Sequence, residues 1–310
     1  MFFVTFSHQG RDRVGILNTQ KDKVLDLLAA QSDLAERGKL SKVDGLYVDM
    51  ISSIRFGELF IEQTKKVLQL LDEEHFHSPR WLLMEDIQLK APIPRPLKNI
   101  FCLGKNYADH AIEMGGVESI PKDPMVFSKA PTTVIGPNEG ILSHHKVTSE
   151  LDYEGELALV IGKKGRGISK EDAWDYVFGY TIINDVTARD LQQRHKQFLI
   201  GKSLDTSCPM GPYLVYREAI SNPSQLKIET RVNGEIRQSS STDQFIFNIP
   251  TIIETLSAGM TLEPGDIIAT GTPSGVGKGF HPPKFLQPGD VIEIAIEGIG
   301  VLRNQVIEDV

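Results

Sequence analysis

From residue 99 onwards, short runs of apolar and β-branched residues recur between turn-forming glycines, prolines and asparagines. Runs such as "ELALVIG" and "VFGYTIINDV" have the length of strands, and Ile292, Ile294 and Ile296 alternate with polar or small residues as in a half-exposed strand. "PGDII" and "PGDVI" repeat one turn-then-strand pattern. Helical candidates are fewer here, chiefly "SKEDAWDYV" and "IPTIIETLSAG". The sequence therefore predicts a β-rich domain over residues 93–310.

A proline-rich connector, "APIPRPLKN", precedes this region. Pro92, Pro94 and Pro96 lack a backbone donor and favour an extended chain. Before the connector, "FFVTF" and "RVGIL" are typical of short strands, and "GELFIEQTKKVLQLLDEEH" has the apolar spacing of a helix. We predict a small α/β domain at residues 1–92, a catalytic domain at residues 93–310, and an α+β, β-rich fold overall.

Composition narrows the class of protein. Hydrophobic residues make up 40% and charged residues 24%, and no run approaches the roughly 18 apolar residues of a membrane span. The formal charge of −8 argues against a nucleic-acid surface but allows a local basic pocket for a small acid. Cys102 and Cys208 form no CxxC pair, and the first residues lack the pattern of a secretory signal. We expect a cytoplasmic protein with no membrane or nucleic-acid partner.

Acidic residues occur at every second position in "LDYEGELALVIG". On a strand, Asp152, Glu154 and Glu156 point to one face, and Asp185 ends the apolar run "YTIIND" further on. Carboxylates placed in this way are the hard oxygen ligands that Mg²⁺, Mn²⁺ and Ca²⁺ prefer. Spacing alone also allows exposed edge strands or salt-bridge partners, so both interpretations stay open at this point.

A second motif, "GKNYADHAIEMG", places His110 and Glu113 three residues apart. On a helical turn they share a face, and Glu113 can orient the imidazole of His110 as a general base that activates water. The motif is not an H-E-x-x-H zinc helix because it has no second histidine. A surface helix with an incidental histidine and glutamate is the alternative.

Two further segments carry candidate ligand-binding groups. In "NDVTARDLQ", Arg189 and Gln192 lie one helical turn apart and suit a substrate carboxylate, while Lys202 in "GKSLDTSCPMGP" suits a developing enolate or the metal carboxylates. "GTPSGVGKG" departs from the phosphate-loop pattern, because Thr272 and Gly279 stand where glycine and serine or threonine are required. It is either a plain loop or a turn whose Thr272 hydroxyl and amides meet a small anion.

In order along the chain, these motifs resemble the fumarylacetoacetate hydrolase family from about Pro94 to the C-terminus. The motifs that carry the resemblance are "GKNYADHAIEMG", "VFSKAPTT", "LDYEGELALVIG", "GYTIINDVTARDLQ", "GKSLDTSCPMGP", "VNGEIRQ" and "LEPGDIIATGTPSGVGKG". The connector and the N-terminal unit resemble the bacterial YisK-like branch, whose members resemble oxaloacetate decarboxylases. The resemblance implies mixed β-sheets rolled into a barrel-like structure, a homodimer, and one Mg²⁺ or Mn²⁺ per subunit.

The resemblance also implies roles for individual residues. It implies that the metal ligands are Glu154, Glu156 and Asp185, and that the catalytic groups are Lys202 and the dyad of His110 and Glu113 on a mobile lid. The residues implied to hold the substrate are Lys129, Arg189, Gln192, Gly271 and Thr272. Asp152 has no ligand role in the family pattern, and its side chain is expected to lie behind the ligands or on the surface.

The expected function follows from a bound divalent ion. A 2-oxo acid that chelates the ion can react through a metal-stabilised pyruvate enolate, and the resemblance favours oxaloacetate decarboxylase. Acylpyruvate or fumarylpyruvate hydrolysis and 5-carboxymethyl-2-hydroxymuconate isomerisation are alternatives, because one enolate site supports all of these reactions. A non-catalytic protein that binds 2-oxo acids or acts as a scaffold is a second alternative.

Overall fold

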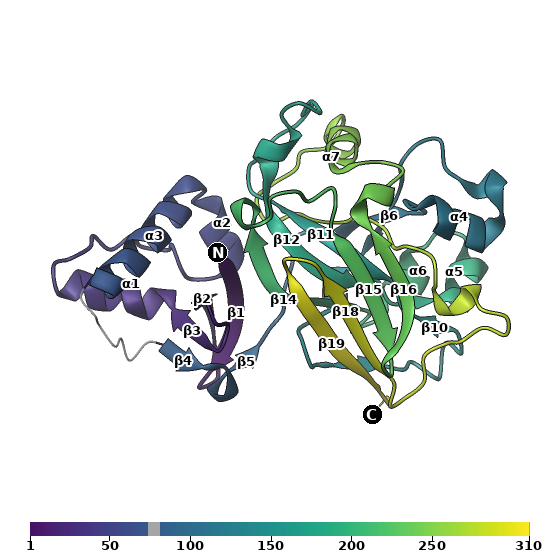
Figure 1. Ribbon diagram of the computed structural model, residues 1–310, viewed down its shortest axis with the longest axis horizontal. Helices are drawn as coiled ribbons and strands as arrows, with labels where there is room; N and C mark the ends of the chain where they lie inside the picture. Colours follow the sequence, from purple (N-terminus) through teal and green to yellow (C-terminus); the bar gives the residue numbers. More distant parts are fainter. Residues whose placement is uncertain (74–80, 310) are drawn as a thin grey trace.

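The computed structural model describes residues 1–73 and 81–309 of the 310-residue chain. Its N-terminal part is a small sheet with helices packed beside it (Figure 1). The elements are β1 (Phe2–His8), β2 (Arg11–Leu17), β3 (Lys23–Asp26), α1 (Leu27–Glu36), α2 (Met50–Arg55), α3 (Glu58–Glu73), β4 (Trp81–Leu83) and β5 (Gln88–Leu89). The predicted strands and long helix are confirmed here, although the end of the predicted helix, beyond residue 73, lies outside the described residues.

Local sequence explains how these elements begin and turn. Gln9 and Gly10 have φ values of 51° and 73°, which is the backbone that a tight two-residue hairpin between β1 and β2 requires. Asp26 ends β3 and caps α1, since its carboxylate accepts a hydrogen bond from the amide of Ala29 at 3.0 Å. The change from strand to helix therefore needs no intervening loop.

The largest sheet combines strands from before and after the proline-rich connector. Its strand order is β4-β3-β2-β1-β14-β12-β11-β17-β6-β7, with β5 beside β1 and β8 beside β14. The added strands are β6 (Ile100–Gly104), β7 (Met125–Lys129), β8 (Val134–Ile135), β11 (Gly155–Ile161), β12 (Val177–Asn184), β14 (Cys208–Tyr216) and β17 (Ile267–Ala269). Every residue of β11 and β12 is buried, which explains why both read as continuous apolar runs without alternation.

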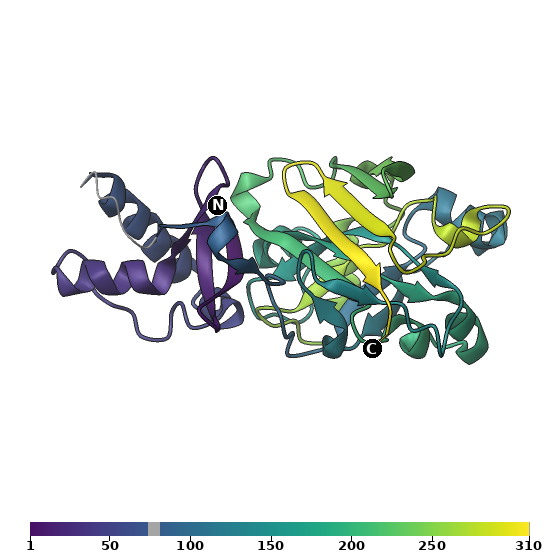
Figure 2. The same ribbon diagram turned by 90° about the horizontal axis from the view of Figure 1, so that it is seen from below.

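A second sheet packs over the first, and Figure 2 shows its strands lying across the teal strands of the large sheet. Its order is β16-β15-β18-β19-β9, and a two-stranded ribbon pairs β10 with β13. The bounds are β9 (Gly140–Leu142), β10 (Leu151–Asp152), β13 (Thr187–Ala188), β15 (Lys227–Val232), β16 (Glu235–Ser241), β18 (Val291–Ile296) and β19 (Gly300–Ile307). In β18, buried isoleucines alternate with half-buried residues, as the sequence predicts.

The β-rich, mixed-sheet fold is therefore confirmed, but the expectation of a barrel-like roll is not. Within residues 1–73 and 81–309, β4 and β7 end the large sheet without pairing to each other, so no closed barrel is found. None of the helices in these residues combines the length and the apolar character that a membrane crossing needs.

The helices of the larger part lie near the ends of the sheets. They are α4 (Ala108–Gly115), α5 (Arg189–His195), α6 (Leu199–Lys202) and α7 (Ile249–Ser257). Short 3₁₀ turns occur at Met84–Asp86, Val117–Ser119, Pro131–Thr133, Ala173–Tyr176, Arg217–Ala219, Thr242–Gln244 and Gly277–Gly279. The expected helix at "SKEDAWDYV" shrinks to one such turn. The hydroxyl of Ser169 bonds locally to Asp172 at 3.0 Å, and Val177 already pairs with Ile161 in the sheet.

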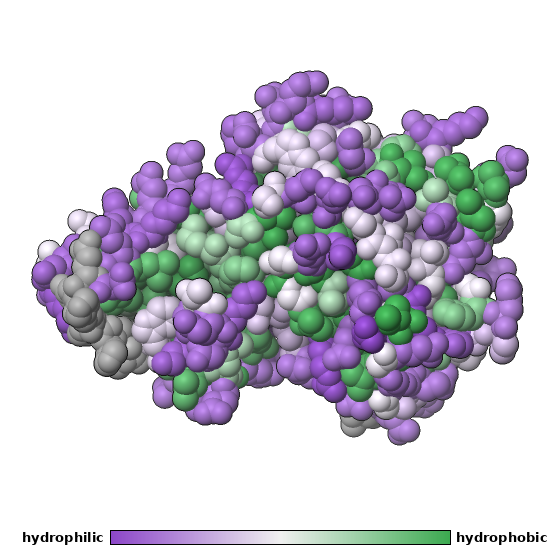
Figure 3. All heavy atoms as spheres, viewed as in Figure 1, coloured by the Kyte–Doolittle hydropathy of each residue, from purple (hydrophilic) through white to green (hydrophobic). Residues whose placement is uncertain are grey.

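Aromatic packing joins the N-terminal unit to the rest. The rings of Phe60 in α3 and Phe178 in β12 stack with their centroids 5.9 Å apart, and Phe3 in β1 lies 4.6 Å from Phe60. Apolar side chains also gather on the surface between the two parts (Figure 3). Cys102 and Cys208 are free thiols and are buried. The division into domains at residue 92 stays a prediction, since the sheet and this aromatic cluster both cross it.

Candidate metal centre and active site

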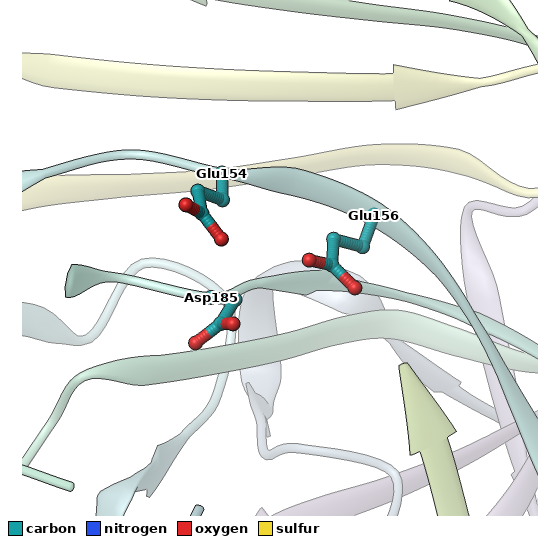
Figure 4. A group of neighbouring side chains, drawn as sticks. All are labelled: Glu154, Glu156 and Asp185. Carbon is teal, nitrogen blue, oxygen red and sulfur yellow. The ribbon is translucent and has the colours of Figure 1, made fainter. Parts of the chain in front are cut away.

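Glu154, Glu156 and Asp185 meet where β11 begins and β12 ends (Figure 4). The two strands pair Gly155 with Asn184, and the amide of Asp185 donates to the carbonyl of Glu154 at 2.8 Å. The side chain of Asn184 also accepts from the amide of Glu154 at 3.0 Å. As a result, one carboxylate oxygen from each of the three acids lies within 4.8 Å of the other two. The structure thus brings the three predicted metal ligands together.

Buried cations surround these acids. Lys202 Nζ lies 2.7 Å from both Glu154 Oε2 and Asp185 Oδ2, and Arg189 Nη1 lies 2.6 Å from Glu154 Oε1. The buried acidic side chains are Asp152, Glu154, Glu156 and Asp185, and the buried cations among them are Lys129, Arg189 and Lys202. The cluster therefore carries one negative charge more than the protein's own cations neutralise.

The carboxylate of the cluster that no cation among the described residues contacts is that of Glu156. Burial alone would raise the pKa of Glu154, but Lys202 and Arg189 lower the pKa to about 2. Within the described chain, the carboxylate of Glu156 has no cation in direct contact, and the one hydrogen bond to it comes from the amide of Gly271 at 2.7 Å. Burial, followed by the charges of Asp185 and Glu154, raises the pKa of Glu156 well above its ordinary value.

The residues present fit a divalent cation. Asp185 Oδ1 is buried and accepts no well-aligned hydrogen bond within the described residues, although Lys129 Nζ lies 2.8 Å away. An oxygen-seeking ion such as Mg²⁺ or Mn²⁺ would bind this oxygen and relieve the repulsion that raises the pKa of Glu156. Three carboxylates also leave coordination positions for water or substrate.

The predicted dyad forms on α4. His110 Nδ1 lies 3.2 Å from Glu113 Oε2, so the spacing of three residues places both side chains on one face of the helix, as expected. The other oxygen of Glu113 accepts a hydrogen bond from the amide of Gly275 at 2.9 Å. The helix is therefore tied to the glycine-rich segment by the same side chain that orients the imidazole.

The glycine-rich segment uses its amides to bind the protein's own carboxylates. The amides of Gly277 and Lys278 donate to Asp152 at 2.7 and 3.0 Å, beside the contact between Gly275 and Glu113. The hydroxyl of Thr272 donates to the carbonyl of Gly155 at 3.0 Å and accepts from Gln238 at 2.7 Å. These contacts hold the segment against the site, and the sequence pattern gave no sign of them.

One donor of Arg189 has no partner within the part of the chain that the structure describes. Its Nε donates to Asp152 Oδ2 at 2.8 Å and its Nη1 contacts Glu154, but its Nη2 is buried with no hydrogen-bond partner in the described residues. Gln192, one turn along α5, lies 3.4 Å from Nη1. A buried unpaired guanidinium nitrogen is costly, and an incoming carboxylate would satisfy it.

Lys129 and Gly271 both contact the clustered acids, Lys129 through Asp185 and Gly271 through Glu156. Lys129 is fully buried, with Nζ 2.8 Å from Asp185 Oδ1, 3.0 Å from the carbonyl of Val186, and bonded also to the carbonyl of Lys202. Its three donors are thus directed to the protein. The expected role of Lys129 and Gly271 in holding a substrate stays a prediction.

A cavity of about 380 Å³ adjoins the cluster of acids, and Glu154 is the one of the three that lines it. Of the residues that the sequence singles out, it is lined by His110, Glu154, Arg189, Gln192, Lys202 and Thr272. Sequence reasoning missed other residues that line it, among them Lys105, Met125, Phe127, Lys196, Phe198 and Lys278. The ring of Phe127 lies 4.8 Å from Lys202 Nζ. Phe127 could have been found from the sequence, because it stands two positions before Lys129 in the motif "VFSKAPTT".

The fold and the site together define a β-rich protein with a buried carboxylate cluster that fits a divalent ion beneath a cationic pocket. The chain belongs to the fumarylacetoacetate hydrolase family, because the domain described as fumarylacetoacetate (FAA) hydrolase C-terminal matches residues 99–307. This match confirms the resemblance inferred from the ordered motifs.

Relatives extend the likeness to the whole chain. The chain is 54% identical to a Bacillus subtilis (strain 168) protein named oxaloacetate tautomerase YisK over 307 residues, or 99% of this chain and 100% of that one. Among solved structures, a fumarylacetoacetate hydrolase from the psychrophilic Exiguobacterium antarcticum is 41% identical, with a TM-score of 0.79 and complete coverage of both chains. The maleylpyruvate hydrolase of Sphingobium sp. SYK-6, in complex with manganese(II) and pyruvate, is 28% identical, with a TM-score of 0.75 and the same coverage.

Proposed function

We propose that this protein is a divalent-metal-dependent enzyme that acts on oxaloacetate, interconverting its keto and enol forms and also removing CO₂ from it. The observation that carries the proposal is the buried cluster of Glu154, Glu156 and Asp185 at the base of a cationic cavity. The name of the B. subtilis relative, oxaloacetate tautomerase, supports the choice of substrate at 54% identity over the full length.

Glu154, Glu156 and Asp185 would hold Mg²⁺ or Mn²⁺ in this site. When bound, the ion would act as a Lewis acid that stabilises negative charge developing on the 2-oxo oxygen of the substrate. The manganese(II) and pyruvate in the maleylpyruvate hydrolase structure support both the ion and the class of ligand.

The side chains around the acids orient the substrate. The unpartnered Nη2 of Arg189 donates to the substrate carboxylate, and Gln192 supplies a second polar contact from the next turn of α5. Lys202 lines the cavity and holds Glu154 and Asp185 in place at the same time. Lys129 Nζ lies 2.8 Å from Asp185 Oδ1, so we assign Lys129 to fixing that carboxylate in addition to the predicted role in holding the substrate.

His110 is the base that transfers the proton of the substrate's C3. Glu113 contacts Nδ1 and favours the tautomer with its proton there, which leaves the lone pair of Nε2 free as a base. His110 lines the cavity, so Nε2 can take a proton from C3 of the keto form and return it in the reverse direction. Tautomerisation to the enol is complete when the 2-oxo oxygen takes up a proton in place of the one removed from C3, and the protonated His110 can supply it. Decarboxylation instead breaks the bond between C3 and C4, and the electron pair of that bond stays in the enolate of pyruvate until a proton arrives at C3.

Hydrolysis of an acylpyruvate is the second candidate function. The name of the structurally similar maleylpyruvate hydrolase favours it, and the same dyad would then activate water. Isomerisation of 5-carboxymethyl-2-hydroxymuconate would use the same base. The dyad that His110 and Glu113 form beside the cavity favours an enzyme over a non-catalytic binding protein.

Substrate comparison tests the proposal. The purified full-length chain is loaded with Mn²⁺ and given oxaloacetate, with the enol followed by ultraviolet absorbance and pyruvate by a coupled lactate dehydrogenase assay. Acetylpyruvate tests hydrolysis in parallel. We expect metal-dependent turnover of oxaloacetate that a chelator abolishes, and loss of both activity and bound metal in Glu154→Ala. Failure to act on oxaloacetate, or equal rates with and without metal, would contradict the proposal.

We further propose that the protein is a homodimer in the cytoplasm, with a barrel-like catalytic domain at residues 93–310 behind the small domain at residues 1–92. Family resemblance supports these assignments. Light scattering coupled to size-exclusion chromatography tests the dimer, which predicts twice the chain mass of 34.4 kDa.

A further inference from the structure

Three lysines line the cavity beyond the buried cluster. Lys105 lies between β6 and α4, Lys196 follows α5, and Lys278 belongs to the 3₁₀ turn of the glycine-rich segment. We call these three residues the rim lysines. Glu154 is the single carboxylate among the described residues that line the cavity, so the lining of the cavity is strongly positive.

The rim lysines lack the strong partners that the deeper cations have. Lys202 and Arg189 contact buried carboxylates at 2.8 Å or less. Within the parts of the chain that the structure describes, Lys105 and Lys196 have no ion pair within 4.0 Å. Lys278 lies 3.5 Å from Glu150, but both side chains are 33% exposed, so water weakens that pair.

The backbone places two of these lysines in an uncommon conformation. Lys105 and Lys196 have φ values of 53° and 58°, in the left-handed region that residues with a Cβ seldom adopt. Lys105 Nζ lies beside the end of α4, only 3.7 Å from where a Cβ on Gly115 would stand. Lys105 is therefore on the side of the cavity where α4 also presents His110.

We propose that the rim lysines, with Lys105 foremost, bind the second carboxylate of a 2-oxo dicarboxylate. This inference rests on the proposed function and specifies the substrate class of the same site. The 2-oxo acid end of such a ligand belongs beside the acidic cluster and Arg189. Its far carboxylate then enters the upper cavity, where leaving it without a cation would be costly. Lys105 and Lys196 are the cations without partners there.

The rim lysines thus select for two carboxylates. A 2-oxo acid with one carboxylate, such as pyruvate, satisfies the deep cations and leaves the rim unused. The cavity of about 380 Å³ has room for a 2-oxo dicarboxylate.

Two inhibitors of equal charge test the inference. Oxalate has only the end that belongs beside the acids, whereas N-oxalylglycine adds a far carboxylate and has no bond that can lose CO₂. Calorimetry with the Mn²⁺-loaded full-length protein measures both affinities. In Lys105→Met we expect about tenfold weaker binding of N-oxalylglycine and less than about twofold change for oxalate. Lys196→Met changes the affinities in the same direction, and Lys105→Arg retains most of the affinity.

A control variant and the kinetics distinguish direct binding of the far carboxylate by Lys105 from a general attraction of anions to a positively charged cavity. Lys66→Met removes the same charge from the exposed face of α3 and is expected to change neither affinity. Lys105→Met should raise KM for oxaloacetate about tenfold and leave kcat within about threefold, because the lysine holds ground state and transition state alike.

Each other outcome has a definite meaning. Equal weakening of both dianions by Lys105→Met would show that the lysine only attracts anions to the cavity, and unchanged affinity for N-oxalylglycine would show no role; either result overturns the inference alone. If the unmodified protein binds neither dianion with Mn²⁺ present, the proposed function fails, and the inference fails with it.

Discussion

Asp152 Oδ2 accepts a hydrogen bond from Arg189 Nε at 2.8 Å, and both side chains are almost completely buried. The same carboxylate accepts hydrogen bonds from the amides of Gly277 and Lys278. Asp152 therefore fixes the guanidinium next to Glu154 and the glycine-rich segment at once. The residue with no expected ligand role connects two walls of the site.

Replacing Asp152 by Asn removes the charge but keeps the shape. We expect the free energy of unfolding to fall by about 3 kcal/mol, because Arg189 loses one buried partner and the amides of the loop lose a charged acceptor. The measurement is denaturant unfolding of the metal-free protein. Glu150→Gln, at the partly exposed pair with Lys278, is the control and should change stability by less than about 0.5 kcal/mol. Similar losses of stability in both variants would contradict the conclusion that Asp152 holds both Arg189 and the glycine-rich segment in place.

Glu156 and Glu154 should respond in opposite ways to the same substitution. Glu156→Gln removes the acid without a contacting cation, so we expect unchanged or higher stability of the metal-free protein and more than about a hundredfold weaker Mn²⁺ binding. Glu154→Gln takes a partner from Lys202 and Arg189, and should lower the free energy of unfolding by up to about 3 kcal/mol. Thermal unfolding and metal titration measure both effects. Equal destabilisation by the two variants would be inconsistent with this charge distribution.

Metal binding should release a proton from Glu156. Its pKa is raised above the ordinary value of 4.5, so in the window between that value and the raised pKa the metal-free protein holds a proton that the ion must displace. Apparent Mn²⁺ affinity therefore rises with pH across this window and levels off above it. By the same linkage, this group makes the metal-free protein less stable as pH rises. Calorimetry at about pH 6, in buffers with different ionisation enthalpies, counts the protons, and a count of zero argues against a protonated Glu156.

Glu113→Gln should slow catalysis without disturbing the metal. The amide can still accept from Gly275, but it no longer stabilises a positive charge on His110, so we expect kcat to fall about a hundredfold. Mn²⁺ affinity should stay within about twofold, since Glu113 is not among the clustered acids. Glu118→Gln, on the exposed turn after α4, is the matched control. A parallel loss of metal binding would mean that the dyad supports the fold of the site.

Neither thiol should react in the folded protein. Burial raises the pKa of Cys208 to about 12 and raises the pKa of Cys102 well above its ordinary value, so little thiolate is present and reagent access is blocked. Ellman's reagent should report no free thiol in native buffer and two in denaturant. Reaction under native conditions would indicate local opening of the sheet around β6 and β14.

Local spacing predicted which side chains share a face, whereas their roles came only from the resemblance to the family. The period of two along β11 placed Glu154 and Glu156 together, and the spacing of three on α4 brought His110 to Glu113. Asp185 needed the motif order as well, because its nearness depends on how β11 pairs with β12. The β-rich fold class followed from short apolar runs, whereas sheet order and the absence of closure depend on long-range pairing.

The contacts that sequence reasoning missed all join residues far apart in the chain. Asp152 reaches Gly277 across 125 positions, and Lys129 reaches the carbonyl of Lys202 across 73. No periodic pattern carries such a contact. Lys105 escaped notice for another reason, since a single lysine in a loop has no partner residue to form a motif with.

The pairing of Phe2 and Phe3 in β1 with Val215 and Leu214 in β14 bears on how the protein would respond to cutting. A protease that cleaved the proline-rich connector would sever the covalent path between the two parts but not the shared sheet or the stacked rings of Phe60 and Phe178. The two fragments should then migrate as one particle under native conditions and separate only in denaturant. The pairing of β1 with β14 thus holds the N-terminal part to the rest of the protein without a covalent bond.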